Sequence, residues 1–165
     1  MNNWLRAAIA LCVFLVVSLA IVGLWTILGL RLNMSVSLPV GLYTVSSRGN
    51  LVEFCPPEGI SWARGYRAAG VCPDGGEPLA KPVIAGPGDK VLVTPVGIIV
   101  NGRMLPATAP LARDSKGREL TRYVGSGSGL WVASGHDPRS WDSRYYGPIP
   151  PSSVRARLRP LWTWH

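Results

Sequence analysis

An apolar segment near the start of the chain is followed by a long region in which short apolar runs alternate with polar and turn-forming residues. Ala7 to Leu30 contains 24 consecutive residues without a charge. At about 1.5 Å per residue, a helix of this length spans roughly 36 Å, which is enough to cross a hydrocarbon core of about 30 Å with some tilt. The pattern therefore predicts a transmembrane helix.

A cleaved signal peptide is the alternative for this segment. The apolar region of a signal peptide is only about 7–15 residues long and ends at a small-x-small cleavage site. Here the run is longer and leads into Gly29, Leu30 and Arg31, which favours an uncleaved membrane anchor over residues 1–30. The flanking charges, Arg6 before the run and Arg31 after it, do not decide its orientation by the positive-inside rule.

The remainder, residues 31–165, reads as short strands separated by turns. Residues 55–72 form an irregular excursion with a short helical turn at 61–68, and the polar, glycine-rich residues 105–129 read as an inserted flap. An Asn-Gly turn marks a hairpin at 97–103, and residues 154–159 alternate as a half-exposed strand does. Further strands are predicted at 42–47, at 51–54, on both sides of the glycine-rich turn within 78–93, and at 130–133. The pattern predicts a mainly β, antiparallel domain.

The segment from Asn33 to Tyr43 carries two serines, Ser35 and Ser37, two positions apart. In an extended strand both would face the same side. Ser37 comes seven residues after Leu30, so it lies within roughly 25 Å of the membrane even if the link is fully extended. We expect this segment either to present a serine for chemistry close to the bilayer or to be a plain polar strand that leaves the membrane.

The three cysteines differ in their surroundings. Cys12 lies in the apolar run and is interpreted as a small apolar residue. Cys55 and Cys72 are 17 positions apart, each is followed by proline, and neither has a Cys or His neighbour at zinc-like spacing. A disulfide between them is the favoured interpretation and would indicate an oxidising compartment. Two buried thiols in a cytosolic domain are the alternative.

The chain is basic, with a net charge of +8, of which +7 lies after Leu30. This charge suits an anionic membrane surface or an acidic partner, and a merely soluble basic surface is the other interpretation. Nucleic acid is not an expected partner, because the arginines are scattered and form no basic run or aromatic-interleaved strip.

Two further segments carry side chains suited to chemistry. Lys81 is a single basic residue in an apolar predicted strand; such lysines usually extend to solvent, but a lysine held in an apolar pocket loses proton affinity. Residues 134–147 mix charged, hydroxyl and aromatic side chains, as an active loop or a structural surface loop does. No His–Asp pair stands beside a serine, and His136 is interpreted as a bystander. A neutral lysine can activate a serine where no histidine does.

Three segments resemble the ordered boxes of the type I signal peptidases, and most closely those of the TraF branch, the conjugative-transfer signal peptidases. They are Ser35-Val36-Ser37-Leu38-Pro39, Lys81-Pro82-Val83-Ile84-Ala85-Gly86-Pro87-Gly88-Asp89 and Ser140-Trp141-Asp142-Ser143-Arg144-Tyr145-Tyr146-Gly147. The Leu-Pro-Val-Gly-Leu-Tyr continuation and the Cys-Pro-Pro at 55–57 are similar to the TraF branch in particular. The resemblance runs from the anchor to about Pro150.

The resemblance implies roles for the residues that match. Ser37 would be the nucleophile and Lys81 its general base. The Ser35 hydroxyl would join the Ser37 backbone N–H in the oxyanion hole, where losing one donor costs about two to three orders of magnitude in rate. One residue separates Ser37 from Pro39 where the general signal peptidases usually have two, so Ser35 stays open as an alternative nucleophile.

The third box would support the dyad. Ser140 matches a serine that orients the lysine, and Asp142 with Arg144 would brace the loop as an ion pair. Asp89 is interpreted as a turn residue. Pro82 stands where the wider family tends to have a basic residue, and because proline donates no backbone hydrogen bond, we expect an edge or a bulge there.

The resemblance implies a single-pass protein of the bacterial inner membrane, with a signal-peptidase-like catalytic domain in the periplasm. The expected activity is that of a serine endopeptidase that processes an exported precursor, with a conjugative pilin as the expected substrate and ring closure by transpeptidation as a further reaction. Membrane lipid and the precursor are the expected partners, and no metal or organic cofactor is needed. A general signal peptidase that removes signal peptides and a non-catalytic pilus-assembly or secretion subunit are the alternatives.

Overall fold

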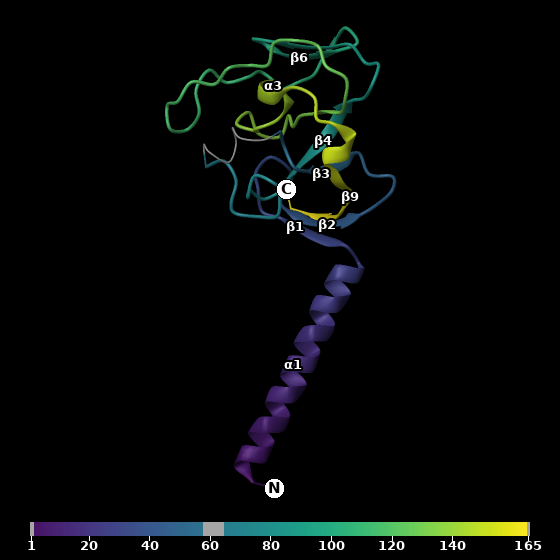
Figure 1. Cartoon of the computed structure of the whole chain (residues 1–165), viewed down its shortest axis with the longest axis vertical. Coiled ribbons are helices and arrows are strands. Elements are labelled where there is room, and N and C mark those ends of the chain that lie inside the picture. Colours follow the sequence, from purple (N-terminus) through teal and green to yellow (C-terminus); the bar gives the residue numbers. More distant parts are fainter. Residues whose placement is uncertain (1, 58–64, 165) are drawn as a thin grey trace.

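The computed structural model describes residues 2–57 and 65–164 and begins with a long apolar helix, α1 (Asn3–Ile27). None of its residues is buried, and an 18-residue stretch within it has a mean hydropathy of 2.9. Figure 1 shows α1 extending away from the rest of the chain, with β1 and β2 at its near end. By length and composition α1 can cross a membrane, and a signal sequence has the same properties.

The main body is an antiparallel six-stranded sheet. In spatial order its strands are β1 (Leu30–Asn33), β2 (Gly41–Val45), β9 (Val154–Thr163), β3 (Leu51–Phe54), β4 (Leu79–Ala85) and β8 (Trp131–Val132). The last strand in sequence thus lies between β2 and β3, which ties the two ends of the domain together. The predicted fold class, an apolar N-terminal helix followed by a mainly antiparallel β domain, is confirmed.

A smaller sheet of β5 (Val91–Thr94), β6 (Gly97–Val100) and β7 (Arg103–Met104) lies at the end of the domain away from α1 (Figure 1). Its predicted Asn-Gly turn is present, and Asn101 and Gly102 both have positive φ angles, as a two-residue hairpin turn requires. Five buried side chains join this sheet to the larger one: Ala85, Val93, Ile98, Trp131 and Ala133.

Strand β4 changes partner along its length, which accommodates the proline within it. Its first half pairs with β3, ending at Leu51 opposite Pro82. Its second half pairs with β8 through Val83 and Ala85, with an irregular register between them. Pro82 therefore lies where one ladder ends and the next begins, although the strand is not at the edge of the sheet.

The expected extended strand through the two serines is wrong. The strand here is β1, which ends at Asn33, and Ser35 and Ser37 lie in the turn that leads to β2. The Asn33 side chain bonds the backbone of the following residues. Such local side-chain bonds compete with a strand ladder and favour a turn.

The two segments predicted to be irregular are residues 55–72 and residues 105–129. Cys55 and Cys72 are joined by a disulfide in the structure. Residues 61–64 of the expected helical turn lie outside the described residues, and 65–68 are not helical. Residues 105–129 form no strand longer than an isolated bridge, yet Leu105 and Tyr123 pack against the core, so this segment contributes to the interior of the domain.

Candidate active site

A cleft of about 850 Å³ lies beside the turn between β1 and β2. It brings together three residues that the sequence singles out, since Ser35, Ser37 and Lys81 all line it. The loop of residues 134–142 forms another part of its wall through Asp137, Arg139 and Trp141. Segments far apart in the sequence therefore meet at one hollow that can hold an extended peptide.

Lys81 is held in this cleft by the first half of β4, which pairs with β3. It lies in β4 opposite Val52 of β3 and is only 3% exposed. Burial lowers the pKa of Lys81 from 10.5 to about 8, the nearby Asp142 and Asp137 raise it, and Arg144 lowers it. A lysine with a pKa of about 8 is neutral in roughly one molecule in ten at pH 7, which gives it real capacity as a general base.

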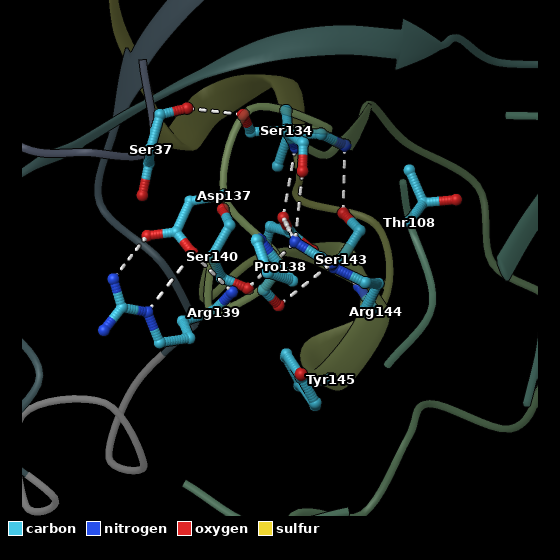
Figure 2. A network of polar contacts seen from close by, with 12 residues as sticks. Ser37, Thr108, Ser134, Asp137, Pro138, Arg139, Ser140, Ser143, Arg144 and Tyr145 are labelled. Carbon is cyan, nitrogen blue, oxygen red and sulfur yellow. Dashed lines mark hydrogen bonds and ion pairs between the residues drawn. The ribbon is translucent and has the colours of Figure 1, made fainter. Parts of the chain in front are cut away.

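The turn that carries Ser37 is fixed by a buried apolar contact and by hydrogen bonds to its backbone. Leu38 is buried in a cluster with Tyr43, Leu51 and Leu158. The Tyr43 hydroxyl donates to the backbone oxygen of Pro39 at 2.7 Å. From the opposite loop the Ser134 hydroxyl donates to the backbone oxygen of Ser37, a contact drawn in Figure 2. The backbone of the candidate nucleophile is therefore fixed to the loop behind Lys81.

Asp142 and Arg144 form a fully buried ion pair behind the cleft. Two arginine nitrogens, Nε and Nη2, each lie 2.8 Å from a different carboxylate oxygen, and both side chains have no exposed surface. The Arg144 guanidinium also donates to backbone oxygens of Ser134, Pro138 and Ser140. The predicted ion pair is therefore present, and one side chain links three points of the loop; its bracing role stays a prediction.

Arg144→Ala is expected to lower the free energy of unfolding by about 3–5 kcal/mol, because it leaves the Asp142 carboxylate buried without its cation. The measurement is urea unfolding of the full chain in detergent, followed by tryptophan fluorescence. Arg139→Ala is the matched control: its side chain is 68% exposed and its pairing with Asp137 is screened by solvent, so we expect little change. Equal effects of the two substitutions would contradict the bracing role.

Ser140 lies in the same loop, with 1% of its surface exposed. Its backbone is bonded, but its hydroxyl has no hydrogen-bond partner among the described residues. A buried hydroxyl without a partner is unusual and costs free energy. Ser140 does not itself line the cleft, and its role in orienting Lys81 stays a prediction.

Ser35 is not arranged as the oxyanion role requires in the resting protein. Its hydroxyl donates to Oδ1 of Asn33 at 2.8 Å, and its single hydrogen is therefore engaged. To stabilise an oxyanion the hydroxyl must rotate away from Asn33. Sequence reasoning had given Asn33 no role, because an asparagine at the end of a strand carries no motif of its own.

His136, interpreted as a bystander, contacts the turn that carries Ser37. Its Nδ1 lies 3.0 Å from the backbone oxygen of Val36, and its backbone N–H donates to the Ser134 hydroxyl. A carbonyl oxygen only accepts, so this contact requires the hydrogen on Nδ1. Ser134 and His136 were not identified as site residues, since their contacts depend on two loops about a hundred positions apart in the sequence.

Aromatic side chains form a further wall of the cleft. The rings of Trp141 and Tyr145 stack with centroids 4.8 Å apart, and Tyr66 meets Trp141 at 4.9 Å. The Tyr66 hydroxyl donates to Asp114 at 2.6 Å, and this bond is the largest cause of the lowered pKa of Asp114.

Among residues 2–57 and 65–164, no group of three or more His, Cys, Asp or Glu side chains could hold a metal ion.

Comparison with known proteins gives consistent relatives. Residues 1–163 match the family model described as signal peptidase, peptidase S26. Two plasmid transfer proteins TraF of Escherichia coli are 40% and 37% identical, over 82% and 89% of this chain and 84% and 90% of theirs. The conjugal transfer protein TraF of Agrobacterium fabrum is 35% identical over 82% of this chain and 84% of its own. The chain belongs to the signal peptidase family, peptidase S26, and to its TraF-type members.

Proposed function

We propose that this protein is a membrane-anchored serine endopeptidase that uses Ser37 as its nucleophile and Lys81 as its general base. The observation that carries the proposal is the burial of Lys81 in the cleft that Ser37 also lines. A buried lysine with a pKa of about 8 can accept and release a proton near neutral pH, whereas an ordinary surface lysine stays charged.

The reaction follows from these groups. Neutral Lys81 accepts the proton of the Ser37 hydroxyl as the oxygen attacks the scissile carbonyl. The carbonyl oxygen becomes an oxyanion, stabilised by the Ser37 N–H and by the Ser35 hydroxyl once it leaves Asn33. The C–N bond then breaks, protonated Lys81 gives its proton to the leaving amine, and an acyl-enzyme on Ser37 remains.

The same acyl-enzyme has two possible fates. Water, deprotonated by Lys81, attacks the ester and releases a carboxylic acid. An amine that attacks instead forms a new amide and returns the Ser37 hydroxyl. If that amine is the other end of the same polypeptide, the product is a ring. Hydrolysis and cyclisation therefore need no further catalytic group, and the choice depends on which nucleophile reaches the ester.

The proposed setting is the periplasmic face of the bacterial inner membrane, with residues 1–30 as the anchor and residues 31–165 as the catalytic domain. Two observations support this placement. Helix α1 has no buried residue and carries no charge after Arg6. The Cys55–Cys72 disulfide belongs in an oxidising compartment. In this placement the partners are membrane lipid and the exported precursor.

A conjugative pilin precursor is the proposed substrate, because the similar proteins are named for plasmid and conjugal transfer. The test is co-production of such a precursor with the wild-type protein in the same bacterial cells, followed by mass spectrometry of the pilin. Cleavage lowers the mass by the removed segment, and ring closure removes one further water. An unchanged precursor mass in these cells would exclude this substrate.

A substrate-independent assay separates the chemistry from the choice of substrate. A fluorescence-quenched peptide with a small-x-small cleavage site represents the general precursor class. Cleavage of this peptide without processing of the pilin would support a general signal peptidase. Failure to cleave either substrate would support the non-catalytic assembly subunit.

A further inference from the structure

The nucleophile loop, residues 34–40, has no strand ladder of its own. Lys81, in contrast, lies in a strand with paired neighbours. The reacting atoms of Ser37 and Lys81 must be aligned closely, since a displacement of about 1 Å can cost about 100-fold in rate. Whatever fixes the shape of this loop therefore influences the rate.

One side chain closes the loop from within. Nδ2 of Asn33 lies 3.0 Å from the backbone oxygen of Ser35, 3.3 Å from that of Leu38 and 3.1 Å from that of Pro39. Its Oδ1 accepts from the backbone N–H of Ser35 at 3.2 Å and from the Ser35 hydroxyl at 2.8 Å. These partners precede and follow Ser37 in the sequence, so the loop is tied together on both sides of the nucleophile.

The chemistry of the partners fixes the orientation of this amide. The NH₂ group has two hydrogens for three carbonyl oxygens, so at least one hydrogen is shared. The opposite orientation would set Oδ1 against those three oxygens and Nδ2 against the Ser35 N–H. Only an asparagine in the observed orientation satisfies both sets of partners, and an aspartate at this position would repel the carbonyl oxygens.

From these contacts we propose that Asn33 is a positioning residue: it sets the loop that presents Ser37 and holds the Ser35 hydroxyl until an oxyanion competes for it. The inference rests on the proposed role of Ser37 as the nucleophile. Asn33 touches no reacting atom; it acts through the backbone of the loop and through Ser35.

Loss of the Asn33 side chain is expected to lower the catalytic rate and to leave the stability of the fold nearly unchanged. Ser35 is exposed and Asn33 is partly exposed, so water can replace the lost hydrogen bonds. Leu38 and Tyr43, which are buried, hold the base of the loop in place. A loop that loses Asn33 therefore keeps its attachment and loses its single shape.

The test uses Asn33→Ala and Asn33→Asp in the full chain in detergent, with the quenched peptide as substrate. We expect kcat to fall about 10- to 100-fold, with KM within about threefold of wild type because the cleft remains. For Asn33→Ala the pH midpoint of kcat/KM should stay near 8, since this substitution adds no charge to the surroundings of Lys81. The melting temperature should stay close to that of the wild type.

Asn50→Asp is the matched control: it makes the same chemical change at an exposed residue that does not line the cleft. Asn33 variants with the kcat of this control would overturn the inference while the wild-type activity upheld the proposed function. A rise in KM alone, or unfolding of both Asn33 variants, would also overturn it. Absence of wild-type cleavage would overturn the proposed function and the inference with it.

Discussion

Ser37→Ala is expected to abolish cleavage of both the precursor and the quenched peptide. Removing the nucleophile of a serine peptidase costs about six orders of magnitude in kcat, which places the residual rate below detection. Folding should be unaffected, because the contact of the loop with Ser134 uses the backbone oxygen of Ser37, which alanine retains. The measurement is peptide turnover by the purified full chain, with circular dichroism to verify the fold.

Two other serine substitutions serve as comparisons for Ser37→Ala. Ser47→Ala, at an exposed position outside the cleft, should leave turnover unchanged. Ser35→Ala removes one proposed oxyanion donor and should lower kcat by about two to three orders of magnitude. An inactive Ser35→Ala protein beside an active Ser37→Ala protein would exchange the roles of the two serines.

Lys81→Met is expected to remove activity to a similar extent, because the described residues that line the cleft with Ser37 include no histidine and no other lysine. In the wild type, kcat/KM should rise with pH to a midpoint near 8, as the Lys81 ammonium loses its proton. The check is a pH profile of peptide cleavage. A profile that is flat between pH 6 and about 9, or retained turnover in Lys81→Met, would contradict a lysine base.

The same lysine makes a separate prediction for stability. Burial lowers the pKa of Lys81 in the folded state to about 8, whereas the unfolded chain keeps the ordinary value of 10.5. Between these values the unfolded state binds the extra proton, so the free energy of unfolding rises with pH. The penalty is complete below about 8 and absent above about 10.5. Lys81→Met lacks this pH dependence, and urea unfolding of both proteins across the window measures the difference.

The strand pattern was predictable because most strands carry local signals. Residues 51–54 form a strand as predicted, and the Asn-Gly turn lies where its backbone preference placed it. The strand β1 was missed, since Leu30 to Asn33 is short, directly follows the apolar run and pairs only with residues beyond the turn. Its formation depends on β2, a tertiary partner that no local pattern announces.

Only those site residues could be predicted whose residue type is unusual for its place in the sequence. A lysine in an apolar strand and an Asp–Arg pair among aromatics are unusual enough to be noticed, and the structure gathers them around one cleft. The supporting contacts of Asn33, Ser134 and His136 were not predictable. They are hydrogen bonds to backbone oxygens, and any residue supplies such an acceptor, so the sequence carries no mark of them.

If Ser37 is the nucleophile, an acyl-enzyme forms on its hydroxyl oxygen. The most direct measurement is mass spectrometry of the intact protein after mixing with an activated ester of a peptide that ends at a small-x-small site, quenched with acid and then mapped by proteolysis. We predict an added mass equal to the acyl group, located on Ser37 and absent from Ser37→Ala. An adduct on Ser35, or turnover of the ester by Ser37→Ala at the wild-type rate, would contradict the role of Ser37 as the nucleophile.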